Sequence, residues 1–238
     1  MAEEIVEQGY RELADTILEH NPGVDLGRVR AAFELADRAH SGQKRKAGTP
    51  YVTHCVAAAQ ICAEMGLDED SIVAALLHDC IEDTAITHED IARQFGAEVA
   101  DIVEGVTKLT RVQFTSREDE QMENLRKMLM AMAKDIRVIL IKIADRLHNM
   151  RTMEYMVAQK QLEKSLETME IYAPIAHRLG LQKVKWELED LSLKYLDPDG
   201  YREIITYLDS KADVLNKFIS DVEKKITDRL TEYNIHAT

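Results

Sequence analysis

Hydrophobic residues recur at spacings of three and four along almost the whole chain. This is the period of an amphipathic helix, whereas half-buried strands alternate with a period of two. The pattern breaks at clusters of helix-breaking residues, of which Asn21-Pro22-Gly23 is the first. The sequence therefore predicts an all-α fold. The expected helices cover about 3–20, 25–40, 53–65, 70–83, a short segment after Thr87, 97–109, 116–134, 136–153, 160–179, 181–195 and a long stretch after residue 200.

Residues with N-cap character precede several of these segments. Asp68 and Asp135 each stand just before an apolar run, where a carboxylate can accept hydrogen bonds from the first free amides of a helix. The spacing of a capping box, a polar residue followed three positions later by an acid, occurs twice. The two pairs are Thr87 with Asp90 and Ser116 with Asp119.

The helix expected over 136–153 is apolar on nearly every side, which is typical of a helix at the centre of a bundle. The segment Asp197-Pro-Asp-Gly200 is predicted to be a turn and a domain boundary. After it, a stripe of apolar residues marks a long amphipathic helix that packs on the main domain or on a further one. We therefore expect a main domain over 1–196 and a helical extension over 197–238.

Composition supports this interpretation and narrows the function. The chain has 238 residues, is 45% apolar and contains few glycines, prolines and aromatics, which disfavours a sandwich or barrel. A net charge of −13 disfavours nucleic acid and anionic membranes as main partners. The longest apolar runs have six residues, the N-terminal segment lacks signal-peptide character, and the three cysteines form no CxxC pair. These features fit a cytoplasmic protein.

The strongest chemical constellation is His78-Asp79-Cys-Ile-Glu82-Asp83, which follows an apolar run. At about 100° per residue, these four ionisable side chains would share one arc of a helix. Such crowding beside a core segment is costly unless a bound divalent cation neutralises it. The alternative is a solvated acidic helix end next to a satisfied histidine.

Two further polar residues, His54 and Asp145, lie in segments otherwise built for burial. Each has a plain interpretation: Asp145 could pair with an arginine, and His54 could be a hydrogen-bonded core histidine. Together with His78 and Asp79 they would supply two imidazoles and two carboxylates. This donor set suits Mn²⁺, Fe²⁺, Co²⁺ or Zn²⁺ better than Ca²⁺ or a structural zinc.

Further polar residues, some of them on the same helix as Asp145, could line a pocket beside this set. Asn149 and Thr152 follow Asp145 at i+4 and i+7, on the same helix face, although they could simply be the fraying helix end. The loop with Arg45 and Lys46 is cationic in an otherwise acidic chain. It could hold phosphates or stack on a base, or it could be a solvated loop.

At this point the sequence resembles the RelA/SpoT family of bifunctional alarmone enzymes, specifically their HD-type hydrolase domain. Five segments in the family's order carry the resemblance: GQKRKAGTPYVTH at 42–54, ALLHDCIEDT at 75–84, EGVTKLT at 104–110, IKIADRLHNMRT at 141–152 and APIAHRLGLQKVKWELEDLSLKYL at 173–196. The resemblance implies a multi-helix HD-domain bundle with a C-terminal helical extension. It also implies hydrolysis of (p)ppGpp, the guanosine tetra- and pentaphosphates, to GDP or GTP and pyrophosphate with Mn²⁺.

The resemblance further assigns roles to individual residues. The implied metal ligands are His54, His78, Asp79 and Asp145. The implied catalytic pair is Glu82 and Asp83, and spacing alone leaves open which of them acts on the water and which on the leaving 3′ oxygen. The implied nucleotide contacts are Arg45 and Lys46 in the loop and Asn149 and Thr152 around the guanosine.

Two features depart from the family pattern. Cys55 stands where proline commonly follows the first histidine, and the chain is shorter than full family members, which continue into a synthetase domain. We expect a fragment that contacts the missing synthetase domain, or else a stand-alone hydrolase. The competing functions are an HD-type phosphohydrolase acting on another nucleotide, a regulatory module that binds the alarmone without turnover, and a helical docking domain.

Overall fold

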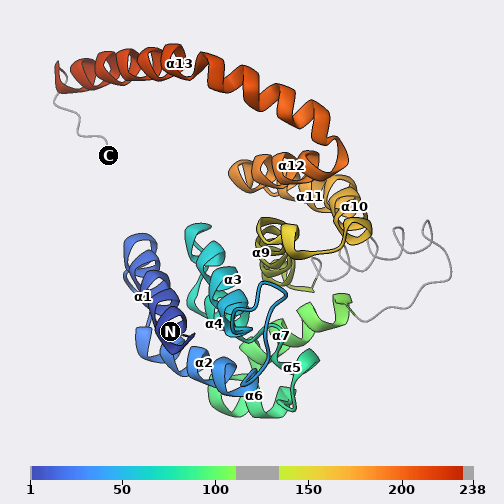
Figure 1. Cartoon of the computed structure of the whole chain (residues 1–238). Coiled ribbons are helices and arrows are strands. Elements are labelled where there is room, and N and C mark those ends of the chain that lie inside the picture. The colour runs from blue at the N-terminus through green and yellow to red at the C-terminus, as the bar shows by residue number, and fades with distance from the viewer. Residues whose placement is uncertain (1, 111–133, 233–238) are drawn as a thin grey trace. The chain divides into compact units, whose positions relative to one another are not determined.

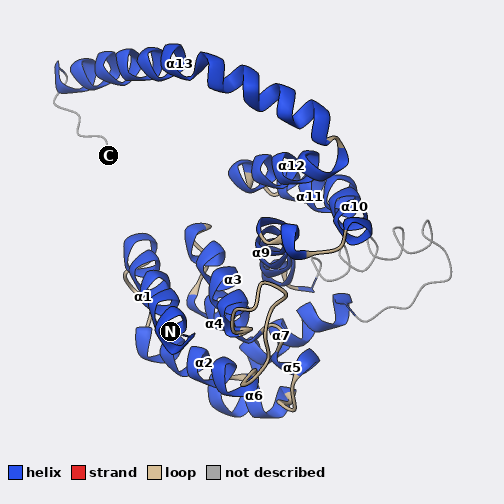
Figure 2. Ribbon diagram, in the orientation of Figure 1, coloured by secondary structure: helices blue, strands red, loops and turns tan. Residues whose placement is uncertain are grey.

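The computed structural model describes residues 2–110 and 134–232, and every regular element in these two segments is a helix (Figures 1 and 2). An isolated antiparallel bridge between Lys44 and Pro50 is the one piece of β pairing in the described chain. The all-α prediction is confirmed. The helix expected over 116–134 falls mainly on 111–133, outside the described residues.

The chain divides into two compact units, Met1–Ser192 and Leu193–Thr238. The division into domains 1–196 and 197–238 stays a prediction. The first unit contains these helices: α1 (Ala2–His20), α2 (Leu26–Ala39), α3 (Val52–Glu64), α4 (Glu69–Leu77), α5 (Cys80–Asp83), α6 (His88–Phe95), α7 (Ala97–Thr110), α9 (Ile136–Arg151), η1 (Met153–Tyr155), α10 (Ala158–Glu167), η2 (Thr168–Tyr172), α11 (Ala173–Arg178) and most of α12 (Gln182–Leu196).

The core of the first unit is built around α3, α4 and α9. Helix α3 packs on α1, α2, α4 and α9, and α4 also packs on α2, α7 and α9 (Figure 1). Every residue from Ser71 to Leu77 is buried, and α9 buries apolar residues on several faces, as expected for a central helix. These three helices therefore form a rigid, water-poor frame for the polar residues that they carry.

Side-chain caps begin these helices as the sequence predicts. Asp68 caps α4 and Asp135 caps α9, each by accepting a hydrogen bond from a backbone amide in the first turn. Thr87 and Asp90 form a complete capping box at the start of α6. Local sequence alone thus determines where these three helices start.

The helix expected over 70–83 is interrupted. Helix α4 ends at Leu77, His78 and Asp79 form a turn, and α5 is a separate single turn. The ring of His78 bonds back to the carbonyl of Ala75, and the Asp79 carboxylate accepts a hydrogen bond from Tyr51. These contacts favour a turn over a continuous helix. The segment is therefore a helix, a two-residue turn and a further single helical turn instead of one continuous helix.

The helix expected over 160–179 is also interrupted, by the π-helical turn η2 between α10 and α11. Glu167 and Tyr172, five residues apart, both contact the buried guanidinium of Arg146, at 2.9 Å and at 4.1 Å from the ring centroid. A π turn bonds residue i to i+5, which brings residues five apart towards one face. The buried arginine therefore explains the wider turn.

The segment expected to be a turn at 197–200 is instead the start of α13 (Pro198–Glu232). Oδ1 of Asp197 accepts a hydrogen bond from the amide of Gly200, and Pro198 occupies the first helical position, where its missing N–H costs nothing. Helix α13 exposes large apolar side chains, among them Tyr207, Phe218 and Ile219. Among the helices described, none combines the length and apolarity that crossing a membrane requires.

Candidate metal and catalytic site

Three core elements bring four of the expected polar residues together. His54 lies in the first turn of α3, His78 and Asp79 form the turn after α4, and Asp145 lies in the middle of α9. His54 and His78 are 1% exposed and Asp145 is 6% exposed. Residues far apart in the chain thus meet inside the core.

The distances are those of a compact donor set. Nε2 of His54 lies 3.3 Å from Oδ1 of Asp145 and 3.6 Å from Oδ2 of Asp79. Nε2 of His78 lies 3.1 Å from the same Asp79 oxygen. His54, His78 and Asp145 each offer a ligand atom within 4.8 Å of the others. Asp79 adjoins this set through both imidazoles.

The orientation of His78 fits a bound cation. Its Nδ1 donates to the carbonyl oxygen of Ala75 at 2.8 Å, so its Nε2 points into the cluster. This Nε2 is buried and has no hydrogen-bond partner among the described residues, although Oδ2 of Asp79 lies 3.1 Å from it. A buried nitrogen without a partner is costly, and a metal ion would satisfy it.

The ionisable groups of this set shift one another's pKa values. Burial lowers the pKa of His78, but the carboxylates of Asp79 and Asp145 raise it more, and the net pKa is about 9. Burial raises the pKa of Asp145, but Lys142 and the two imidazoles outweigh burial and hold this pKa well below its usual range. The carboxylates are therefore ionised at neutral pH, and His78 holds a proton that a cation would displace.

Three residues around the set were not singled out in the sequence. Lys142 donates to Oδ2 of Asp145 at 2.7 Å. Tyr51 donates from its hydroxyl to Oδ2 of Asp79 at 2.8 Å and lies 3.2 Å from Oδ2 of Asp83. Nδ1 of His148 lies 2.7 Å from Nδ1 of His54. Polar residues 142, 145, 149 and 152 follow one another at spacings of three and four and so share one face of the helix, a signal that points to Lys142.

The predicted nucleotide contacts are only partly linked to this set. Arg45 donates to Oδ1 of Asn149 at 2.6 Å, and Nδ2 of Asn149 donates to Oδ1 of Asp145 at 2.5 Å. Thr152 ends α9, where its hydroxyl donates to the carbonyl oxygen of His148 at 3.1 Å. Lys46 is exposed on the same loop as Arg45.

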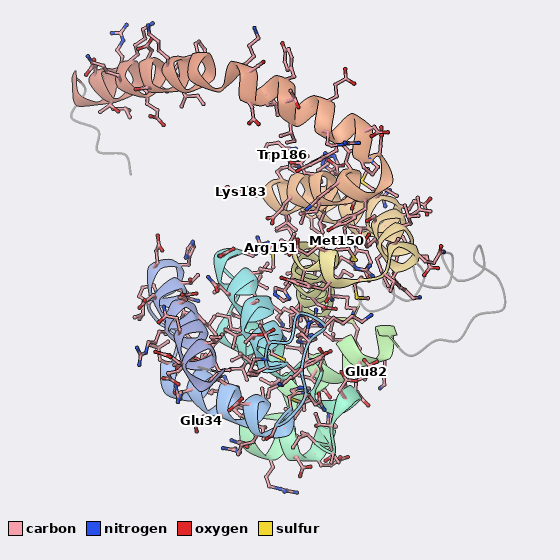
Figure 3. All side chains as sticks on the ribbon, viewed as in Figure 1. Glu34, Glu82, Met150, Arg151, Lys183 and Trp186 are labelled. Atoms are coloured by element: carbon pink, nitrogen blue, oxygen red, sulfur yellow. The ribbon has the colours of Figure 1, made fainter. Side chains whose placement is uncertain are left out.

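The predicted catalytic pair lies on α5, next to the metal-ligand turn. Asp83 is exposed and Glu82 is half-buried, and Figure 3 labels Glu82 on this helix. The loop before α3 faces Asp83 through two contacts: the Tyr51 hydroxyl reaches its carboxylate, and Gln43 donates to its backbone carbonyl at 3.2 Å. The pair therefore borders the loop that carries Arg45 and Lys46.

The loop itself is an ordered turn. The bridge between Lys44 and Pro50 closes it, and the amide of Arg45 donates to the carbonyl of Thr49 at 2.9 Å. Gly42 and Gly48 have φ values of +81° and +85°, a region that favours glycine. The two glycines therefore allow the tight path that directs Arg45 towards α9.

A second group of possible ligands lies on the surface. His88, Asp101 and Glu104 approach one another between α6 and α7, and Nε2 of His88 is 2.9 Å from Oδ1 of Asp101. Lys108 already pairs with Glu104 at 2.8 Å. This group offers a matched surface control for the buried one.

Residues 32–182 match the family profile described as "HD domain", which covers more than half of the chain and the whole buried donor set. The chain belongs to the HD-domain family. Its resemblance to the RelA/SpoT proteins is also confirmed. The HD-domain chain is 48% identical over 220 residues to the "Probable GTP pyrophosphokinase" of Mycobacterium leprae, a match that covers 92% of the chain and 28% of that protein. It is 45% identical over 221 residues to the "Bifunctional (p)ppGpp synthase/hydrolase SpoT" of Escherichia coli, covering 91% of the chain and 32% of that protein.

A solved structure described as "A metazoan ortholog of SpoT hydrolyzes ppGpp and plays a role in starvation responses" is also similar to this HD-domain chain. The two are 32% identical, the match covers 53% of this chain and 70% of that one, and the TM-score is 0.43. The HD-domain chain thus spans about a third or less of the length of the bacterial relatives above.

Proposed function

We propose that the chain is a metal-dependent hydrolase that removes the 3′-diphosphate of (p)ppGpp and releases GDP or GTP and pyrophosphate. The observation that carries this proposal is the buried set of His54, His78 and Asp145, with the unpartnered Nε2 of His78 aimed into it. The names of the relatives, among them a (p)ppGpp synthase/hydrolase, support the choice of substrate.

The residues that would hold the metal are His54, His78, Asp79 and Asp145. Mixed imidazole and carboxylate donors without thiolate favour a first-row transition ion, and we propose Mn²⁺ as the resident ion, with Fe²⁺, Co²⁺ and Zn²⁺ as competitors. When bound, the ion lowers the pKa of a bound water and offsets phosphoryl charge. Mn²⁺ titration and elemental analysis of the purified chain would rank the four ions.

The remaining site residues supply positioning and proton transfer. Glu82 and Asp83 would orient the attacking water and protonate the leaving 3′ oxygen, and Tyr51 would hold Asp83 next to the Asp79 carboxylate. Their division of labour is open. The rate of hydrolysis should be measured against pH for Glu82→Gln and for Asp83→Asn. The general base is the residue whose substitution removes the fall in rate at acidic pH.

We propose that the loop and the end of α9 bind the nucleotide. Arg45, held by Asn149, would flank the base, and exposed Lys46 would pair with a distal phosphate. Asn149 and Thr152 would border the guanosine. Substitution of Lys46 by Gln should raise KM with little effect on kcat, because a cation that pairs with a distal phosphate contributes equally to ground-state and transition-state binding.

The decisive experiment incubates the 238-residue chain with ppGpp and Mn²⁺ and measures pyrophosphate and orthophosphate separately. Pyrophosphate release that a chelator abolishes supports the proposal. Asp145→Asn should remove the activity, whereas Asp101→Asn, which removes a surface carboxylate from another His-Asp pair, should leave it unchanged.

The competing functions predict other results. Orthophosphate release, or turnover of other nucleotides but not ppGpp, would indicate a different HD-type phosphohydrolase. Tight binding of ppGpp without turnover in the presence of Mn²⁺ would indicate a regulatory module. Either result would overturn the proposal.

We further propose that residues 197–238 form a helical link to a synthetase domain, with which the hydrolase domain makes intramolecular contact in a cytoplasmic protein. The greater length of the bacterial relatives and the exposed Tyr207, Phe218 and Ile219 of α13 support this proposal. Hydrolysis rates should be compared for the full chain and for a version that ends at Leu196. We expect loss of α13 to change the rate of hydrolysis, and equal rates would count against an influence of this extension on the hydrolase domain.

A further inference from the structure

The contact between His54 and His148 is a hydrogen bond between two like atoms. The two Nδ1 atoms lie 2.7 Å apart, and the ring centroids are 4.8 Å apart with the planes tilted by 39°. Two lone pairs would repel and two N–H groups would clash, so one ring must donate and the other must accept. The tautomer of each histidine therefore determines the tautomer of the other.

Metal binding by His54 is possible in only one of the two arrangements of donor and acceptor. Nε2 of His54 faces Oδ1 of Asp145 and Oδ2 of Asp79, so it needs a free lone pair to bind a cation there. The hydrogen of a neutral His54 must then lie on Nδ1, and His148 must accept it. The reverse arrangement would place a hydrogen on Nε2, inside the cluster, and would block metal binding.

His78 is oriented in the same way, by an Nδ1 hydrogen bond to a different acceptor. Its Nδ1 donates to the carbonyl of Ala75, which can only accept, and this leaves Nε2 for the cluster. His54 lies in the first turn of α3, and the acceptor at its Nδ1 comes instead from α9, in the form of His148. The helix that supplies Asp145 therefore also supplies the acceptor for His54.

We propose that His148 is a positioning residue for the metal site: it accepts the Nδ1 hydrogen of His54 and so directs the Nε2 lone pair of His54 to the cation. The inference rests on the metal site of the proposed function. It requires only an acceptor where Nδ1 of His148 lies. The substitution His148→Asn would place an amide oxygen near that point, whereas His148→Leu would keep the apolar volume and lose the acceptor.

The experiment measures Mn²⁺ affinity of the 238-residue chain without substrate, by calorimetry or by the electron paramagnetic resonance signal of free Mn²⁺. His148→Leu should weaken Mn²⁺ binding roughly 10- to 100-fold, the usual effect of losing such an outer partner. His148→Asn should stay within about threefold of the unsubstituted chain, since the acceptor remains. Circular dichroism melts of both variants test that they fold.

Which of the two His148 variants binds Mn²⁺ more tightly distinguishes a positioning role from a packing role. A packing role predicts that Leu preserves binding better than Asn, and this order, or equal binding by all three proteins, would overturn the inference. His54→Ala tests the proposed function separately, because it should abolish tight Mn²⁺ binding. If His54→Ala loses the ion while His148→Leu keeps it, the proposed metal site stands and the positioning role fails. If the unsubstituted chain binds no Mn²⁺, both fail.

Discussion

Lys142 donates a hydrogen bond to Oδ2 of Asp145 at 2.7 Å from one turn earlier on α9, and leaves Oδ1 of that carboxylate to face His54 at 3.3 Å. The ammonium thus compensates a buried charge from the side of Oδ2, while Oδ1, which also accepts a hydrogen bond from Asn149, faces His54. Burial lowers the pKa of Lys142, but the attraction of Asp145 outweighs burial and raises it, so the amine stays charged.

Substitution of Lys142 by Met should therefore be destabilising. It leaves the Asp145 carboxylate buried without its main counter-charge, which should reduce the free energy of unfolding by about 3 kcal/mol. Urea unfolding of the metal-free chain measures this. Addition of Mn²⁺ should restore part of the loss, because a cation beside Asp145 replaces the missing charge.

Lys108→Met is the matched control, because Lys108 pairs with Glu104 at the surface and is 67% exposed. Its effect should be about 0.5 kcal/mol or less. Equal destabilisation by the two substitutions would contradict the assigned role of Lys142.

Mn²⁺ affinity should increase with pH. In the metal-free chain the pKa of His78 is about 9, raised from its ordinary value by Asp79 and Asp145 against the opposing effect of burial. Below that pKa the cation must displace one proton from the ring, so affinity should rise about tenfold per pH unit. Between about pH 6.5 and 8.5 the gain should approach about 100-fold.

The other imidazoles near the site should contribute little to the increase of Mn²⁺ affinity with pH. Burial, with the nearby positive charge of Arg45, lowers the pKa of His148 to about 3, and burial also lowers the pKa of His54. Both rings are therefore already neutral in this pH range. Calorimetry in buffers of different ionisation enthalpy counts the released protons, and a value near zero would be incompatible with His78 as a protonated ligand.

The hydroxyl of Tyr51 should tune the metal site through Asp79. Tyr51→Phe removes a hydrogen bond of 2.8 Å to the Asp79 carboxylate and should weaken Mn²⁺ binding by about 1 kcal/mol, or about fivefold. Tyr10→Phe removes a hydroxyl that donates to the backbone of Leu26 and should leave the affinity unchanged. If both variants bind Mn²⁺ equally well, the Tyr51 contact does not position the ligand.

Arg45 and Asn149 should act as one unit in nucleotide turnover. Arg45→Gln and Asn149→Leu both break the link from the loop to Asp145, so each should lower kcat/KM for ppGpp about tenfold or more. The double variant should lose much less than the sum of the two effects, with a coupling of about 1 kcal/mol or more.

A second double-mutant cycle provides the control for the coupling between Arg45 and Asn149. Gln161 donates its side-chain hydrogen bond to the carbonyl of Met153, whereas Arg45 donates to Asn149. Arg45→Gln and Gln161→Leu should therefore add independently. Additive losses in the first cycle would show that Arg45 and Asn149 bind the nucleotide separately.

The positions of most helices follow from local sequence. The apolar period and the caps at Asp68, Thr87 and Asp135 place α4, α6 and α9 because these signals act within one or two turns. The break after Leu77 and the π turn over Thr168–Tyr172 were not predictable in this way. Both depend on contacts with side chains from elsewhere, Tyr51 in the first case and Arg146 in the second.

The sequence by itself determined which residues are chemically out of place: His54 and Asp145 in apolar helices, and His78-Asp79 after an apolar run. Only the tertiary structure decided that they lie within a few ångströms of one another, and that Tyr51 contacts Asp79 from 28 residues away and His148 contacts His54 from 94 residues away along the chain. The physical reason is that burial preference is encoded residue by residue, whereas a hydrogen bond between distant residues depends on how whole helices pack.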